Sequence, residues 1–342
     1  MTITKSIGIA ALLISSAQAA QATQVTALFQ DLMNYTRAAD YNVTTGNYVA
    51  GVVLDGNYTG TDAPKEWGTL GGIAYDWNGN FWALGKDLSG YARALQYDRT
   101  TGNYVTGVIL DGNYTGNSAP KEWDMMGDIA FDSLGKFWVL GKDLFGNTRA
   151  LQYDLSTGNY VTGVVLDGNY TGTDAPKEWG TLGHIAFDKL GNFWALGKDL
   201  SGYTRALQYD LSTGNYVTGV ILDGNYTGTD APKEWGTLTG IGFDADNNFW
   251  AVGSDLLGYA RIRQYDLSTG NYVIGAILDG NYTGTDAPKE WATLGDIAFG
   301  PASIEPPVRD AVPEPATWAM LIAGFGLVGG MARRRAPSRF AA

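Results

Sequence analysis

The stretch Asp-Gly-Asn-Tyr-Thr-Gly begins at Asp55 and returns at Asp111, Asp167, Asp223 and Asp279. After each copy comes Lys-Glu-Trp, which ends at Trp67, Trp123, Trp179, Trp235 and Trp291. Both motifs recur every 56 residues, the distance from Asp55 to Asp111, and the spacing never slips. A fixed period of this size indicates stacked copies of one supersecondary unit.

One repeat unit contains four segments that favour β-strands, at residues 128–132, 137–141, 149–154 and 160–166. These segments are short and rich in aromatic and β-branched residues, and turn residues separate them. A long polar loop over residues 167–183 leads to the next unit. The repeated body shows no helical periodicity. Four antiparallel strands per unit are typical of a β-propeller blade.

The two incomplete ends of the repeat predict a closed ring. First strands are expected to begin at Gly72, Asp128, His184, Gly240 and Asp296, and second strands near Val25, Phe81, Phe137, Phe193 and Phe249. Residues 25–54 supply three strands without a first one, whereas residues 296–300 supply a first strand alone. Together they complete a fifth blade, which removes exposed sheet edges. The sequence therefore predicts an all-β, five-bladed propeller over residues 25–300, closed by blade sharing between its two ends.

The N-terminal residues 1–22 have the pattern of a secretory signal peptide. Lys5 supplies the positive end, residues 7–14 the short apolar core, and Ala20-Gln21-Ala22 or Ala17-Gln18-Ala19 a cleavage site. We therefore expect export through the Sec machinery. The chain has no cysteine, so its stability must come from packing and ring closure. Its net charge of −12 disfavours nucleic acid as a partner.

The C-terminal part carries a second set of signals. A stiff linker at residues 301–312 leads to Pro313-Glu314-Pro315, then to an apolar run at 316–332, and then to Arg333, Arg334 and Arg335. We expect one transmembrane helix here, with residues 337–342 as a cytoplasmic tail. The order of these features over residues 313–336 resembles the PEP-CTERM sorting segment of bacterial exported proteins. This resemblance implies processing by an exosortase near Pro313-Glu314-Pro315, anchoring at the inner membrane before the cut, and a cell-surface or extracellular product.

The repeated loops are the candidate binding surface. Tyrosine and tryptophan rings can cover the apolar faces of sugars, and five weak copies gain avidity on a repetitive polymer. The candidate ligand-binding residues are Asn57, Tyr58, Trp67, Asn113, Tyr114, Trp123, Asn169, Tyr170, Trp179, Asn225, Tyr226, Trp235, Asn281, Tyr282 and Trp291. The architecture resembles that of five-bladed propeller lectins. In the alternative interpretation these residues only build a turn and fill the space between blades.

The same loop offers oxygen ligands at Asp55, Asn57, Thr59 and Asp62, which makes Ca²⁺ a candidate ion. The glycine placement departs from the EF-hand pattern, and Ser118 replaces the last aspartate in the second copy. A purely structural role for these oxygens is the alternative. No other cofactor is expected.

A catalytic site needs residues with different roles, and only one ring of positions differs strongly between the blades. Asp128, His184 and Asp296 occupy it, near the expected mouth of the channel, and His184 is the single histidine of the chain. Together they could hold a metal or perform acid–base chemistry. The alternative is a solvated rim with an incidental histidine. We expect no catalytic residue and no resident metal.

The sequence thus favours an exported, non-catalytic propeller that binds extracellular polysaccharide or matrix through its repeated loops. A structural or adhesive propeller for protein–protein contact is one alternative, and a hydrolase with its site at the channel mouth is the other.

Overall fold

The computed structural model describes residues 23–31, 35–54, 67–87, 91–110, 123–143, 147–166, 179–199, 203–222, 235–255, 258–278 and 291–300. The chain divides into two compact units, Met1–Ala302 and Ser303–Ala342, and every described residue belongs to the first. Among these residues there are strands and turns, and no helix that could span a membrane. The predicted signal peptide, linker, transmembrane segment and tail lie outside the described residues.

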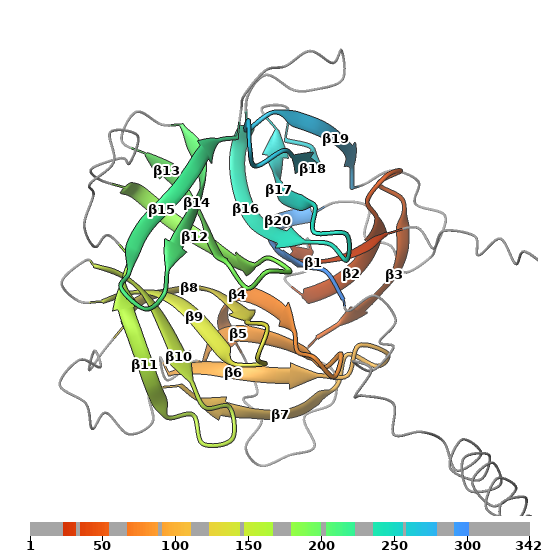
Figure 1. The fold of residues 1–342 in the computed structure, drawn as a ribbon. Coiled ribbons are helices and arrows are strands. Elements are labelled where there is room, and N and C mark those ends of the chain that lie inside the picture. Colours follow the sequence, from red (N-terminus) through yellow and green to blue (C-terminus); the bar gives the residue numbers. More distant parts are fainter. Residues whose placement is uncertain are drawn as a thin grey trace, which may run out of the picture. The chain divides into compact units, whose positions relative to one another are not determined.

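The first unit is a ring of five four-stranded antiparallel sheets, as predicted (Figure 1). Blade 1 is formed by β20 (Trp291–Ala298), β1 (Gln24–Asp31), β2 (Thr36–Asn42) and β3 (Tyr48–Val53). Blade 2 contains β4 (Trp67–Tyr75), β5 (Phe81–Asp87), β6 (Ala92–Tyr97) and β7 (Tyr104–Ile109). Blade 3 contains β8 (Trp123–Phe131), β9 (Phe137–Asp143), β10 (Thr148–Tyr153) and β11 (Tyr160–Val165).

Blade 4 contains β12 (Trp179–Phe187), β13 (Phe193–Asp199), β14 (Thr204–Asp210) and β15 (Asn215–Ile221). Blade 5 contains β16 (Trp235–Phe243), β17 (Phe249–Asp255), β18 (Ala260–Tyr265) and β19 (Tyr272–Ile277). The innermost strands β4, β8, β12, β16 and β20 contact one another in sequence, and β20 also contacts β4. This last contact closes the ring.

Blade 1 is shared between the two ends of the repeat, which confirms the predicted closure. The last strand, β20, pairs with the first, β1, with Thr26 opposite Ala298 and Ala27 opposite Ile297. Figure 1 shows β20 in blue beside β1 in red. Because β20 fills the inner position, blade 1 has the same four-stranded order as the other blades.

The innermost strands begin earlier than the sequence analysis predicted. Each starts at the tryptophan of Lys-Glu-Trp, five residues before the predicted start, as Trp67 before Gly72 shows. The pairing continues because β-bulges absorb extra residues. In β12 the register shifts between Trp179 and Thr181 and again between Leu182 and His184. The expected long loop is therefore shorter at its C-terminal end, and its tryptophan belongs to a strand.

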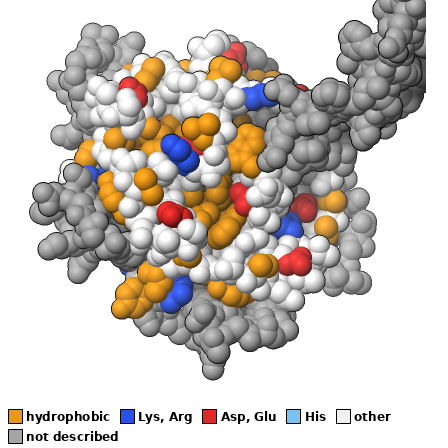
Figure 2. All heavy atoms as spheres, turned by 60° about the horizontal axis from the view of Figure 1, so that its bottom comes forward, with side chains coloured by type: hydrophobic (Ala, Val, Ile, Leu, Met, Phe, Trp, Pro, Cys, Tyr) orange, Lys and Arg blue, Asp and Glu red, His pale blue; other side chains and the backbone are white. Residues whose placement is uncertain are grey.

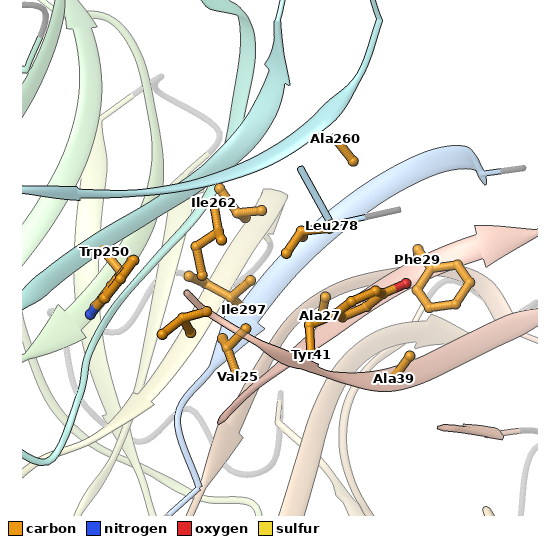
Figure 3. Close-up of a cluster of buried hydrophobic side chains, with 12 residues drawn as sticks. Val25, Ala27, Phe29, Ala39, Tyr41, Trp250, Ala260, Ile262, Leu278 and Ile297 are labelled. Carbon is orange, nitrogen blue, oxygen red and sulfur yellow. The ribbon is translucent and has the colours of Figure 1, made fainter. Parts of the chain in front are cut away.

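The hydrophobic core is divided into five clusters, one between each pair of neighbouring blades. Figure 3 shows the cluster at the closing interface, where Trp250 and Ile262 of blade 5 meet Val25, Ala27 and Ile297 of blade 1. Burial on this scale favours the ring because each blade buries both faces against its neighbours. A single blade has no core of its own.

Four of the five interfaces use the same aromatic contact. A tryptophan of one blade lies against a phenylalanine of the next, with ring centroids 6.2–6.4 Å apart. The pairs are Trp82–Phe131, Trp138–Phe187, Trp194–Phe243 and Trp250–Phe299. Between blades 1 and 2 the equivalent positions hold Thr26 and Tyr75, whose hydroxyl oxygens are 2.8 Å apart. This interface is therefore polar where the others are aromatic.

Candidate functional site on the ring axis

The candidate site lies in the middle of the innermost strands, where each strand contributes one residue to an axial ring. These residues are Gly72, Asp128, His184, Gly240 and Asp296. Asp128 and Asp296 are buried, with 0% and 1% of their surface exposed. They are not at the start of a strand, because β8 and β20 begin five residues earlier, and they are not part of a solvated rim, because both are buried.

Three of the axial residues converge across the ring. His184 Nδ1 lies 3.7 Å from Asp128 Oδ2 and 3.6 Å from Asp296 Oδ1. One ligand atom from each of the three residues lies within 4.8 Å of the other two. We call this group the axial triad. It joins blades 3, 4 and 1, and it brings together the three residues that the sequence singled out as asymmetric.

Each aspartate of the axial triad is held by backbone amides. Ile185 N–H of the next blade donates to Asp128 Oδ2 at 2.7 Å, and Ile129 N–H donates to Asp128 Oδ1 at 2.7 Å. In the same way, Ile73 N–H donates to Asp296 Oδ2 at 2.9 Å. The carboxylates are thus fixed in orientation and connect neighbouring innermost strands. Asp296 Oδ1 and His184 Nδ1 accept or donate no hydrogen bond among the described residues.

Two glycines make room for these carboxylates. A Cβ atom at Gly72 would lie 1.9 Å from Asp128 Oδ1, and one at Gly240 would lie 2.5 Å from Asp296 Oδ1. Real non-bonded atoms do not approach so closely, so each aspartate occupies the space of its neighbour's missing side chain. The two glycines and the axial triad therefore form one complementary set.

The electrostatics of the axial triad favour bound positive charge. Burial alone would lower the pKa of His184, but its contacts with Asp128 and Asp296 outweigh burial and raise the pKa to about 10. Burial, together with the negative charge of Asp128, raises the pKa of Asp296 well above its ordinary value. His184 therefore holds its proton strongly at neutral pH, and the protonated form of Asp296 is favoured. Imidazole and carboxylate are also ligands for divalent metals, so these residues could hold a metal ion.

The loop candidates are distributed differently. Asn57 and Tyr58, their copies in the other repeats, and the proposed calcium ligands lie outside the described residues. The five tryptophans open the innermost strands, and Trp67 pairs through its backbone with Asp87 at the end of β5. The tryptophan backbones are therefore anchored in the sheet, and they do not belong to the loop as predicted.

The sequence analysis missed a polar network at the interface between blades 1 and 2. Arg99 donates to Asp40 at 2.5 Å and to the hydroxyl of Tyr75 at 3.1 Å, and Thr26 donates to Asp40 at 2.6 Å. The signal was present in the repeat. Arg99 stands where later copies have leucine, and Asp40 stands where they have glutamine.

Charged side chains do not gather on the face of the ring seen in Figure 2. Among the described residues of that face, basic and acidic groups lie singly between hydrophobic and neutral ones. The described residues of that face therefore form no continuous basic surface for nucleic acid, which agrees with the acidic composition of the chain.

Comparison with known proteins supports the sorting signal. Residues 311–336 match the PEP-CTERM protein-sorting motif. The chain therefore carries the signal of an exported protein that is anchored at the membrane before exosortase processing. A comparison with curated proteins gave no match.

Several solved structures share the fold at low sequence identity. A protein of unknown function from Bacteroides caccae is 12% identical, with a TM-score of 0.41, over 81% of this chain and 98% of that one. A luciferin-regenerating enzyme is 11% identical, with a TM-score of 0.41, over 82% and 80%. An engineered GH43 glycoside hydrolase is 12% identical, with a TM-score of 0.43, over 81% and 53%. These likenesses concern the fold alone.

Proposed function

We propose that this protein is an exported, non-catalytic propeller that binds extracellular polysaccharide through the five repeated loops of its ring. The observation that carries the proposal is the equivalence of the five loop anchors. Each loop leaves after a leucine whose N–H donates to the carbonyl oxygen of the first residue in the third strand of the same blade, at 2.9–3.0 Å. These leucines are Leu54, Leu110, Leu166, Leu222 and Leu278.

Each of the five loops that follow these leucines leads to an innermost strand, and that strand starts at the next tryptophan. The fifth loop leads to β20, the strand that closes the ring. Both anchors are thus repeated around the ring. Five loops of nearly identical sequence then start and end on one face, which suits a ligand that is itself repetitive. Weak contacts at several loops add up to avidity on a polymer.

The burial of the axial triad favours binding over hydrolysis as the function. A hydrolytic site must admit its substrate to the acid and the base. Asp128 and Asp296 are almost completely buried, and their oxygens accept bonds from strand amides. The side chains of the axial triad, which differ between blades, are therefore held inside the ring. The side chains that would contact a polymer are those of the repeated loops. The sorting motif adds an extracellular setting in which such polymers occur.

The test is polysaccharide binding by the purified full-length protein, measured on a glycan array and by co-sedimentation with insoluble polymers. Variants would replace Tyr58, Tyr114, Tyr170, Tyr226 and Tyr282 by alanine, first one at a time and then together. We expect a small loss for one replacement and a loss of roughly 100-fold or more for all five, because avidity multiplies across sites.

A matched control would truncate exposed apolar residues in turns at the opposite ends of the strands, with Leu134→Ala and Leu190→Ala. These variants should bind as well as the unchanged protein. Failure of the unchanged protein to bind any glycan would contradict the proposal. Full binding by the five-fold tyrosine variant would contradict it as well, and would leave protein–protein contact as the better explanation.

A further inference from the structure

We propose that Asp128, His184 and Asp296 bind one divalent transition-metal ion, such as Zn²⁺, on the axis of the ring. This site lies inside the propeller and goes beyond the proposed binding of polysaccharide at the loops. It rests on four features of the axial triad, which are its atom separations, its unpaired buried atoms, its glycine neighbours and its position in the ring.

The separations fit a metal better than they fit hydrogen bonds. His184 Nδ1 is 3.6 Å and 3.7 Å from the two carboxylate oxygens, which is longer than a hydrogen bond between charged groups. An ion in the plane of the three atoms and equidistant from them, with these two separations and a third edge between about 3.7 and 4.8 Å, would lie about 2.1–2.4 Å from each. Zn²⁺ is bound by histidine nitrogen and carboxylate oxygen at about 2.0–2.2 Å.

Two of the three atoms that face one another lack other partners. Asp296 Oδ1 and His184 Nδ1 are buried and have no hydrogen-bond partner among the described residues. A buried carboxylate oxygen without a partner costs free energy, and the negative charge of Asp128 also acts unfavourably on the carboxylate of Asp296. A divalent cation would offset both terms, because two carboxylates and a neutral imidazole give it an electrically neutral shell.

The ring is shaped around these ligands. Gly72 and Gly240 leave the space into which Asp128 and Asp296 project. Backbone amides fix both carboxylates, at Oδ2 of Asp296 and at both oxygens of Asp128. Such amides serve the metal by orienting its ligands. The imidazole of His184 retains 17% exposure, so a water molecule could complete a four-coordinate shell.

The site would also link distant parts of the chain. Asp296 is on β20, the strand that closes blade 1, whereas Asp128 and His184 are on β8 and β12. A metal bound by all three would tie the closing strand to two other blades. Metal binding should therefore stabilise the closed ring, since a site made of distant ligands is absent from the unfolded chain.

The first test uses the fact that His184 is the only histidine. Full-length protein without a histidine tag would be stripped with a chelator, titrated with Zn²⁺ and studied by calorimetry and X-ray absorption. We expect one tight site with one imidazole and at least two oxygens at about 2.0–2.2 Å. An all-oxygen shell, or no stoichiometric binding of Zn²⁺, Co²⁺, Mn²⁺ or Ni²⁺, would overturn the proposal without any mutation.

The second test uses replacements that should leave the fold of the ring intact. His184→Gly introduces the residue found at Gly72 and Gly240, and Asp296→Asn keeps the shape of the side chain. Each should weaken Zn²⁺ binding by more than about 100-fold, because even outer-shell changes cost 10–100-fold. Asp246→Asn removes an exposed turn carboxylate and should leave the affinity unchanged. Equal affinity in His184→Gly and the unchanged protein would overturn the proposal.

Thermal unfolding provides an independent measurement. Zn²⁺ at about 100 times its Kd should raise the Tm of the unchanged protein by about 5 °C or more. The His184→Gly variant should show no such rise. A rise of equal size in both proteins would assign the metal to another site and contradict the proposal.

Discussion

The guanidinium of Arg99 lies 2.5 Å from the carboxylate of Asp40, across the interface between blades 2 and 1. At three other interfaces the equivalent turn residue is a leucine, Leu155, Leu211 or Leu267, that packs against the core. Arg99 also lies over the ring of Phe81, with 5.1 Å to the centroid. One interface of the propeller is thus specified by charge and hydrogen bonds, which distinguishes the blade that closes the ring from the others.

Replacing this arginine by the residue of the other blades should destabilise the protein. Arg99→Leu leaves Asp40 without its cation in a partly buried position, and we expect a loss of about 1–3 kcal/mol in the free energy of unfolding. Adding Asp40→Gln, the residue of the other blades, should recover part of the loss. Urea unfolding of the single and double variants measures both effects. Equal stability of Arg99→Leu and the unchanged protein would show that the pair contributes nothing.

Two glycines with positive φ should differ in how much a side chain destabilises the protein. Comparing them separates backbone strain from a clash with the neighbouring blade. Gly158 has a φ of +73°, and a Cβ there would lie 2.0 Å from the carbonyl oxygen of Ile109 in the neighbouring blade. Gly258 has a φ of +83°, but among the described residues no atom lies within 4 Å of its Cβ position. We expect Gly258→Ala to cost about 1–2 kcal/mol and Gly158→Ala about 2–5 kcal/mol. Equal costs in denaturant unfolding would mean that the turn does not touch its neighbour.

The turns between the third and fourth strands of blades 3, 4 and 5 should contribute a pH-dependent term to the stability of the protein. In each of three turns a serine donates to an aspartate through its N–H at 2.8 Å and its hydroxyl at 2.7 Å. Hydrogen bonds from the serine hydroxyl and backbone, and then from the following threonine, lower the pKa of Asp154, Asp210 and Asp266 below the ordinary 3.8. A depressed folded-state pKa stabilises the protein above pH 3.8, and this stabilisation disappears as the pH falls through the folded pKa.

The test is a triple variant with alanine at Ser156, Ser212 and Ser268. Its deficit in unfolding free energy should be constant from pH 7 down to about 4.5 and should shrink at lower pH. Urea unfolding across this range measures the deficit. A deficit that does not change with pH would show that the hydroxyls do not act on the carboxylates.

The glycines next to the axial triad provide a further prediction. In Gly72→Ala the new methyl group would displace Asp128, whose Oδ1 occupies that space, and Zn²⁺ binding should be lost. Gly183→Ala, one residue before His184, meets no atom within 4 Å and should bind Zn²⁺ normally. Calorimetric titration of both variants checks the pair. Normal binding by Gly72→Ala would mean that the carboxylate of Asp128 is not a ligand.

Processing at the sorting motif should depend on its first residues. With Pro313, Glu314 and Pro315 replaced by alanine, we expect the propeller to remain uncut and attached to the membrane, because these residues open the motif matched at 311–336. Alanines at Pro306 and Pro307, which precede the motif, should leave processing intact. Immunoblotting of membrane and medium fractions measures the outcome. Continued processing of the first variant would refute cleavage by an exosortase at this place.

The number of blades and the closure could be predicted because the spacing of the repeat is fixed and its two ends complement each other. The starts of the innermost strands could not. Glycines and polar residues before Gly72 have the composition of a loop, yet Thr69 pairs with Lys86 and Trp67 with Asp87. The bulges that permit this pairing depend on the partner strand, and a local pattern does not record it.

The sequence identifies the members of the axial triad only as residues that differ between the five repeats. Comparing the five copies singles out Asp128, His184 and Asp296, but their burial and their approach to within 4.8 Å depend on the radius of the ring. The network around Arg99 escaped prediction for a related reason. Its members are far apart in sequence, and only the contact between blades 1 and 2 makes them neighbours.

The position of β20 determines when the ring can close. The strand is made last among those of the propeller, yet it occupies the inner edge of the blade that contains the first strand. Until residues 291–298 are in place, β1 has no partner on one side, and the innermost strands β16 and β4 have no strand between them. Such distant pairing is slow to form. Closure of the ring therefore depends on the last strand of the propeller, and a chain that lacks residues 291–298 would present open sheet edges.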